Sequence, residues 1–141
     1  MTAKILFPND NIIKTSLFKV EQDWEVPIPG FFILAPLRKV RSIAEFTDEE
    51  SSEFGSLLRK VRQGMQEVLH IHDVYLFQNE DTEHNFHLWI FPRHAWMEHY
   101  GKKIQSVRPI MEHAVEHMST DDVVAEVRDC VTKMRSYLRT I

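Results

Sequence analysis

The sequence has few of the residues and segments that several common classes of protein need. It contains a single cysteine, Cys130, so it can form no internal disulfide and offers no cluster of thiolate ligands for zinc. No apolar run approaches the roughly 18 residues of a membrane span. The opening segment, MTAKILFPND, has neither the apolar core nor the cleavage site of a signal peptide. These absences predict a cytoplasmic protein without a membrane partner.

Clustered cations and glycine-rich phosphate loops are also missing. The chain has 17 Lys and Arg against 21 Asp and Glu, a formal net charge of −4, and the cations form no basic patch of the kind that binds a duplex. It has four glycines and neither a P-loop nor the serine elbow of the α/β-hydrolases. A nucleic-acid polymer is therefore not expected as a partner, and the commonest classes of NTPase and serine hydrolase are excluded.

The hydrophobic pattern indicates one α+β domain over residues 1–141. Alternating apolar residues predict two half-buried strands at 17–20 and 24–26, and the apolar run that Pro36 closes predicts a third. Thr47 and Glu50 form a capping box before a long helix that reaches Leu69. The segments VYLFQN and NFHLWIF predict two further strands, and apolar stripes in 109–118 and 123–141 predict two C-terminal helices. The expected fold is an antiparallel sheet of about five strands with one long helix and two C-terminal helices.

Histidine is abundant, with eight in 141 residues. His113 and His117 belong to the segment HAVEH, which has the residue order of an inverted zinc-protease motif. A catalytic zinc site also needs a third protein ligand, and the acidic residues that follow occupy capping and exposed positions of the last predicted helix. We therefore interpret this segment as a polar helix face and predict no metal site and no cofactor.

The histidine with the most informative surroundings is His87. It lies in the stretch TEHNFHLWIFPR, which spans residues 82–93. In the predicted strand, Asn85, His87 and Trp89 lie on the face opposite the apolar core positions. The stretch resembles the active-site strand of the histidine triad (HIT) family, whose pattern is His-x-His-x-His, then apolar residues and often Pro-Arg. Counting back from Pro92 and Arg93 places the middle histidine of that pattern at His87, the first at Asn85 and the third at Trp89.

Other segments match the same family in order. Pro29-Gly30, the apolar strand after it and Pro36 are similar to the family's Pro-Gly-His, strand and proline, and Lys39 lies near where a histidine commonly follows. Asn79 ends the preceding strand, as an asparagine does in the family, and Thr82 lies five residues before His87, where the family has Ser or Thr. The resemblance covers about 12–94 and leaves about 105–141 as a helical extension.

The resemblance implies a nucleotide hydrolase or nucleotidyltransferase, homodimeric, acting at the α-phosphate of a dinucleoside polyphosphate or a nucleotide conjugate. The middle histidine, His87, would form a covalent nucleotidyl intermediate. Asn79 and Thr82 would bind the α-phosphate. The remaining candidate substrate-binding or proton-donating residues are Asn85, Trp89, His84, Arg93, His94 and His99.

The residues themselves support this chemistry in part. Neutral imidazole is a competent nucleophile near pH 7, and the second ring nitrogen of His87 needs an acceptor, which a backbone carbonyl near residue 85 would provide. The indole of Trp89 offers one N–H donor and no proton relay, so it can bind an oxygen or stack on a base but cannot protonate a leaving group. The alternative is a catalytically weak or inactive nucleotide-binding protein that keeps the HIT fold. In either case we expect the nucleoside in an apolar cleft near the first strands and the start of the long helix. Phe18, Phe31 and Ile33 are candidate walls of this cleft, and packing in the core explains them equally well.

Overall fold

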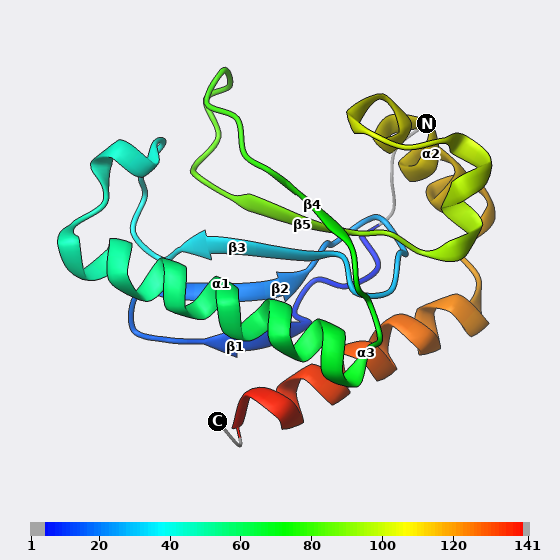
Figure 1. Ribbon diagram of the computed structural model, residues 1–141, viewed down its shortest axis with the longest axis horizontal. Coiled ribbons are helices and arrows are strands. Elements are labelled where there is room, and N and C mark those ends of the chain that lie inside the picture. Colours follow the sequence, from blue (N-terminus) through cyan, green and yellow to red (C-terminus); the bar gives the residue numbers. More distant parts are fainter. Residues whose placement is uncertain (1–4, 140–141) are drawn as a thin grey trace.

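The computed structural model describes residues 5–139 and has a five-stranded antiparallel sheet at its centre (Figure 1). The strands lie side by side in the order β1-β2-β3-β5-β4, so β1 and β4 are the two edges. The predicted α+β architecture, with one long helix and two C-terminal helices, is confirmed. The strands are β1 (Asn11–Lys14), β2 (Phe18–Gln22), β3 (Phe32–Pro36), β4 (Val74–Phe77) and β5 (Leu88–Pro92).

The strand bounds differ from the predicted ones at two places. The sheet begins with β1, which precedes the first predicted strand. The predicted strand at 24–26 is wrong, because Asp23 accepts hydrogen bonds from the backbone N–H groups of Glu25 and Val26 at 3.2 and 2.9 Å. This Asx-type turn bends the chain and leaves Trp24 44% exposed. At the other end of the sheet, β5 begins at Leu88, so His87 is the last residue before the strand.

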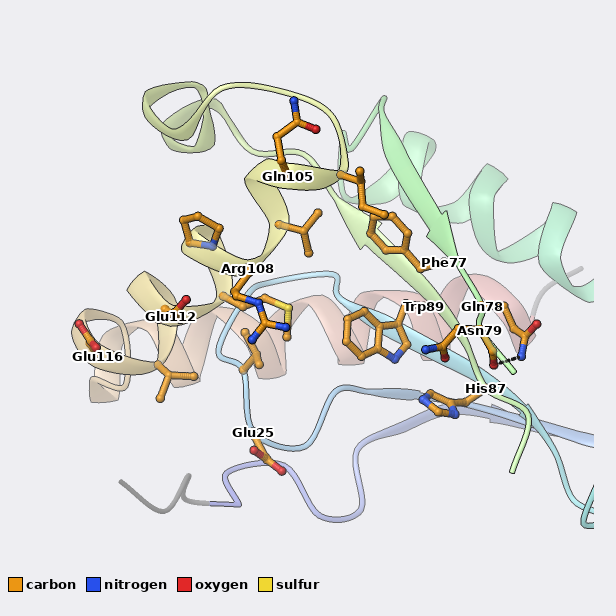
Figure 2. Close-up of a pocket in the computed structure, with 16 residues that line it drawn as sticks. Glu25, Phe77, Gln78, Asn79, His87, Trp89, Gln105, Arg108, Glu112 and Glu116 are labelled. Carbon is orange, nitrogen blue, oxygen red and sulfur yellow. Dashed lines mark hydrogen bonds between the residues drawn. The ribbon is translucent and has the colours of Figure 1, made fainter. Parts of the chain in front are cut away.

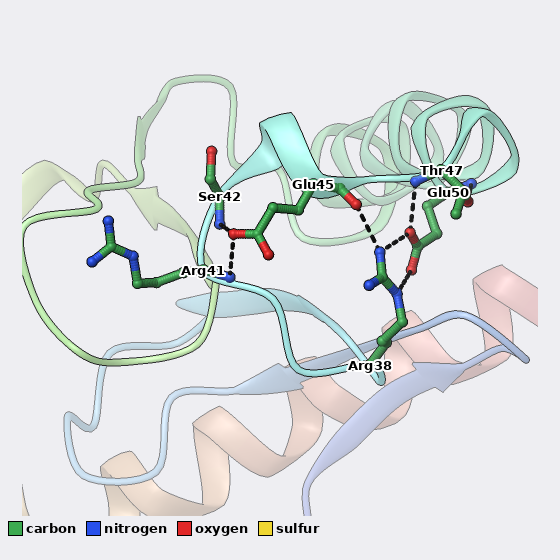
Figure 3. A network of polar contacts seen from close by, with 6 residues as sticks. All are labelled: Arg38, Arg41, Ser42, Glu45, Thr47 and Glu50. Atoms are coloured by element: carbon green, nitrogen blue, oxygen red, sulfur yellow. Dashed lines mark hydrogen bonds and ion pairs between the residues drawn. The ribbon is translucent and has the colours of Figure 1, made fainter.

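The long helix α1 (Asp48–Val68) covers one face of the sheet. Its predicted capping box is present: Glu50 N–H donates to Thr47 Oγ1 at 3.1 Å, and Thr47 N–H donates to Glu50 Oε1 at 2.8 Å. Figure 3 shows Arg38, which follows β3, donating to both Glu50 oxygens from Nε and Nη2 at 3.2 and 2.8 Å. This guanidinium holds the pKa of Glu50 at about 2. The start of the helix is thereby tied to the end of β3.

The two C-terminal helices lie on opposite sides of the sheet. The helix α3 (Asp121–Arg139) packs against α1 and β1, and its Val131, Met134 and Leu138 join the hydrophobic cluster under α1. It crosses α1 closely at Gly64, where an added Cβ would lie 2.7 Å from Tyr137 Cδ1. The helix α2 (Val107–His117) packs on the other face, with a second hydrophobic cluster. Three short 3₁₀ turns complete the fold: η1 (Ile43–Glu45), η2 (Ala95–Tyr100) and η3 (Ile104–Ser106).

The two hydrophobic clusters decide which aromatic residues can face a ligand. Phe18 belongs to the cluster under α1 and Phe31 to the cluster under α2, and both are 0% exposed. The prediction that these two side chains form walls of a cleft is therefore wrong, since alternation alone cannot distinguish a covered face from an open one. Within residues 5–139, no helix has the length and apolar character needed to cross a membrane.

Candidate functional site

A cavity of about 1050 Å³ lies between the β4–β5 face of the sheet and α2 (Figure 2). One wall is the sheet, with Phe77 and Trp89, and the opposite wall is the side of α2 that carries Val107, Met111 and Val115. The side chains that line it are mixed in character, with an apolar floor and polar groups at both ends. The polar and charged lining residues are Glu25, Gln78, Asn79, His87, Gln105, Arg108, Glu112 and Glu116.

His87 lies at one end of this cavity, half-buried, immediately before β5. Its Nδ1 is 2.8 Å from the backbone oxygen of Asn85. A carbonyl can only accept, so Nδ1 carries the hydrogen, and the neutral ring has its lone pair on Nε2. The acceptor that the sequence required near residue 85 is thus supplied by the backbone, independently of the side chain at that position.

Trp89 lies on the same side of the strand as His87, with 6.4 Å between the ring centroids. Its indole makes edge contacts with Phe31 at 5.6 Å and Phe77 at 6.4 Å, and these contacts fix the ring in the cavity wall. The position of the third family histidine is therefore filled by a rigid aromatic surface beside the imidazole.

Asn79 also lines the cavity next to His87 (Figure 2). Phe77 pairs with Trp89 in the sheet, and continuing that antiparallel register by two residues puts Asn79 opposite His87. The Asn79 amide nitrogen donates to Asp81 Oδ1 at 2.7 Å, and its backbone oxygen accepts from Gln78 Nε2 at 2.7 Å. Its second amide hydrogen has no hydrogen-bond partner among residues 5–139.

Three other predicted site residues lie in the exposed β4–β5 loop and do not line the cavity. Thr82 Oγ1 accepts a weak hydrogen bond from His84 N–H at 3.4 Å. The His84 ring remains close to the site, because its centroid is 6.4 Å from that of His87. The side chain of Asn85 is exposed, and its contribution to the site is the backbone oxygen.

Arg93 and His94 bind other parts of the chain. Arg93 donates to the Gly101 backbone oxygen at 2.8 Å and lies over the Tyr75 ring at 5.5 Å. His94 Nε2 is 2.6 Å from the backbone oxygen of Pro29, and burial lowers the pKa of this histidine, although the hydrogen bond opposes the shift. Both side chains hold the segment after β5 and do not line the cavity, and His99 is likewise outside it.

The charged residues on α2 were missed by sequence reasoning. Arg108, Glu112 and Glu116 occupy exposed positions along the edge of the apolar stripe, where charge is ordinarily solvated. Only the placement of α2 over β4 and β5 brings them to the cavity. Figure 2 shows Glu112 and Glu116 at the end away from His87, so the cavity has an imidazole end and an acidic end.

The HAVEH segment lies on α2. His113 Nδ1 is 2.8 Å from the Tyr100 hydroxyl, which can donate to it, and the rings of His113 and His117 are 5.1 Å apart. In the part of the chain that the structure describes, no group of three or more His, Cys, Asp or Glu side chains is arranged to hold a metal ion. His113 instead packs between Trp96 and Tyr100.

Comparisons with known proteins identify the class of fold. No protein-family model matches the sequence. No curated protein matches it either. Solved structures do match: a zinc-bound histidine triad family protein from Mycobacterium smegmatis is 15% identical, with a TM-score of 0.59 over 92% of this chain and 88% of that one. A histidine triad protein from Bradyrhizobium japonicum is 14% identical, with a TM-score of 0.64 over 90% of this chain and 88% of that one.

The diadenosine triphosphate hydrolase of Plasmodium falciparum, solved with cyclomarin A, is 13% identical, with a TM-score of 0.63 over 93% of this chain and 77% of that one. These likenesses confirm the expected histidine triad fold. They also extend well beyond the 12–94 segment that carried the sequence resemblance.

Proposed function

We propose that the protein is a nucleotide phosphohydrolase or nucleotidyltransferase that acts at an α-phosphate through a nucleotidyl intermediate on His87. The observation that carries the proposal is the hydrogen bond from His87 Nδ1 to the Asn85 backbone, which leaves Nε2 as a nucleophile at the end of a cavity large enough for a nucleoside. The hydrolase from Plasmodium falciparum with the same fold supports the reaction class.

The reaction has two displacements at phosphorus. Nε2 of His87 forms a bond to the α-phosphorus, and the bond from that phosphorus to the leaving group breaks with its electron pair. Water or a second acceptor then forms a bond to phosphorus and loses its proton to solvent, the P–N bond breaks, and Nε2 regains its lone pair. In this proposal the Asn79 amide donates to the α-phosphate oxygens, and donors of this kind are worth about 3 kcal/mol each at a transition state.

The residue at 89 sets the leaving group that this site can expel. Indole cannot protonate a departing oxygen or nitrogen, whereas a nucleoside polyphosphate leaves readily without a proton. The site therefore fits a dinucleoside polyphosphate better than an amide conjugate of a nucleotide. The base and sugar would lie against Trp89 and α2, and Thr82 and His84 in the flanking loop would approach the α-phosphate when substrate is bound.

A test needs a covalent readout. The protein is incubated with diadenosine polyphosphates and with adenosine phosphoramidate, quenched in alkali to preserve the P–N bond, and analysed by intact mass. We expect product AMP and an adduct that the His87→Asn variant lacks. The matched control is His94→Asn, whose side chain lies outside the cavity. Turnover by His87→Asn at the wild-type rate would refute the proposal.

The second candidate, a nucleotide-binding protein with little activity, is favoured by one observation: Trp89 occupies the position where the family has its third histidine. Binding of AMP without turnover of any member of the panel would establish this alternative. Absence of both binding and turnover would refute the nucleotide site altogether.

The proposal includes a homodimer in the cytoplasm. The edge strand β4 has one neighbour in the sheet, and its Leu76 is 49% exposed, so a second copy can pair with this edge. Light scattering of wild type and of Leu76→Glu tests this assembly, since a charge at a paired edge would give monomers.

A further inference from the structure

Two exposed cations, Lys39 and Arg41, lie next to the segment that carries His87 but outside the cavity. The backbone N–H of Phe86 donates to the Val40 oxygen at 2.7 Å, so residues 39–41 run alongside residues 85–87. Val40 and Phe86 are each 3% exposed and belong to the same hydrophobic cluster under α1. Val40 turns into this cluster, and Lys39 and Arg41 on either side of it are exposed, next to the segment that carries His87.

Both cations are unpaired. Among residues 5–139, neither the Lys39 ammonium nor the Arg41 guanidinium has an ion pair or a hydrogen bond, and Arg41 uses only its backbone N–H, toward Glu45. Figure 3 shows the Arg41 side chain pointing away from the network of Arg38 and Glu50. Two free cations at one end of a site attract an anion, and the attraction is screened by salt.

The two other directions from His87, along the cavity and toward the β4–β5 loop, lead to acidic residues. Inside the cavity, Arg108 is outnumbered by Glu25, Glu112 and Glu116. The β4–β5 loop carries three more exposed carboxylates, of Glu80, Asp81 and Glu83. A chain of phosphates that starts at His87 is therefore repelled in the directions of the cavity and the loop, and the segment 39–41 offers the favourable direction.

We propose that Lys39 and Arg41 bind the β-phosphate and any further phosphates of a nucleotide whose α-phosphate lies at His87. The nucleoside would occupy the cavity, and the phosphate chain would leave it over residues 39–41. This inference rests on the proposed function, and it assigns these two residues a binding role at the leaving-group side of the substrate.

The test compares nucleotides that differ only in phosphate number. AMP, ADP and ATP are titrated calorimetrically into the His87→Asn variant, which prevents turnover, at low and at physiological salt. We expect ATP to bind about 10-fold more tightly than AMP at low salt. Adding Lys39→Gln and Arg41→Gln to the same background should reduce that gain to less than about twofold and leave AMP affinity unchanged. These ratios correspond to about 1.4 kcal/mol per factor of ten.

Matched controls are Lys14→Gln at the far edge of the sheet and Arg59→Gln on α1, which remove the same charges away from the site. ATP binding no tighter than AMP binding, or a gain that the double substitution leaves intact, would refute this inference while the proposed function stands. Loss of the gain in Arg108→Gln instead would place the phosphates inside the cavity and refute it as well. Failure of AMP itself to bind would refute the proposed function.

Discussion

Trp89→His would place an imidazole two residues from His87 on the same side of the chain, where the indole now lies 6.4 Å away between ring centroids. At this separation one phosphoryl group can contact both rings. The new imidazole could give a proton to a departing oxygen or nitrogen, which indole cannot do. We expect the variant to cleave substrates with poor leaving groups faster than wild type and to gain little on dinucleoside polyphosphates.

The size of this gain follows from two opposing effects. General acid catalysis contributes about 10² to 10⁴ in rate, and the lower end is expected because the smaller ring loses the edge contacts with Phe31 and Phe77 that hold the indole. The lost packing should lower the free energy of unfolding by about 2 kcal/mol. The matched control is Trp89→Phe, which loses packing without adding a proton donor.

The assay is single-turnover formation of AMP from a series of adenosine 5′-phosphate esters and amidates whose leaving groups range from acidic to basic. The slope of log rate against leaving-group pKa should be steep in wild type and in Trp89→Phe, and shallow in Trp89→His. The gain should grow as pH falls from 8 to 6, since imidazole has an ordinary pKa of about 6.5 and must be protonated to act as an acid. Equal slopes in all three proteins would refute the reasoning that indole limits this site.

Further predictions concern stability. Arg38 holds the pKa of Glu50 at about 2, below its unfolded value, so the pair stabilises the fold above about pH 4.5 and loses this effect as pH falls toward 2. In thermal unfolding, the Glu50→Gln variant should therefore be less stable than wild type at pH 7, and its stability should vary less with pH in that window. Met134→Ala removes a fully buried contact between α3 and α1 and should cost about 3 kcal/mol in urea unfolding, whereas an unchanged midpoint would show that α3 adds nothing to the core. Gly30→Ala should cost about 1 to 3 kcal/mol, because Gly30 has φ +82° and an added Cβ would lie 2.5 Å from Ile71 Cδ1; Gly55→Ala, with open space around it, is the control.

The elements with strong local signals were predictable from the sequence. The capping box of Thr47 and Glu50 places the start of α1 correctly, because both hydrogen bonds are made within four residues. The core face of Phe86, Leu88 and Ile90 follows from alternation. The segment after β2 was misread because the alternation of Trp24 and Val26 looks like a strand, while the Asp23 turn that breaks it depends on a side chain whose hydrogen bonds the pattern does not show.

The candidate site was predictable in one half. Trp89 lies on β5, whereas His87 and Asn79 lie just beyond the ends of β5 and β4, and the antiparallel register of these two strands brings all three to one wall of the cavity. The opposite wall comes from α2, whose apolar stripe predicts burial but does not say against which surface. Arg108 and Glu112 therefore looked like solvated residues until the long-range packing of α2 on the sheet was known.

The two faces of the sheet are packed separately, and this separation explains how the chain can have Asn85 and Trp89 at the positions of two histidines of the triad pattern without loss of the fold. Met134 and Val61 are fully buried on the face that α1 and α3 cover, and this cluster stabilises the fold without contributing a side chain to the cavity. On the other face, Nδ1 of His87 is held by a backbone oxygen, so the side chain at 85 is free to change without loss of the tautomer. Under the proposed function, substitution at 89 would alter the leaving groups that can be expelled, and charge at 39 and 41 would alter the phosphates that can be bound. If that proposal holds, substrate choice would vary on one face of the sheet while the cluster on the other face preserves the fold.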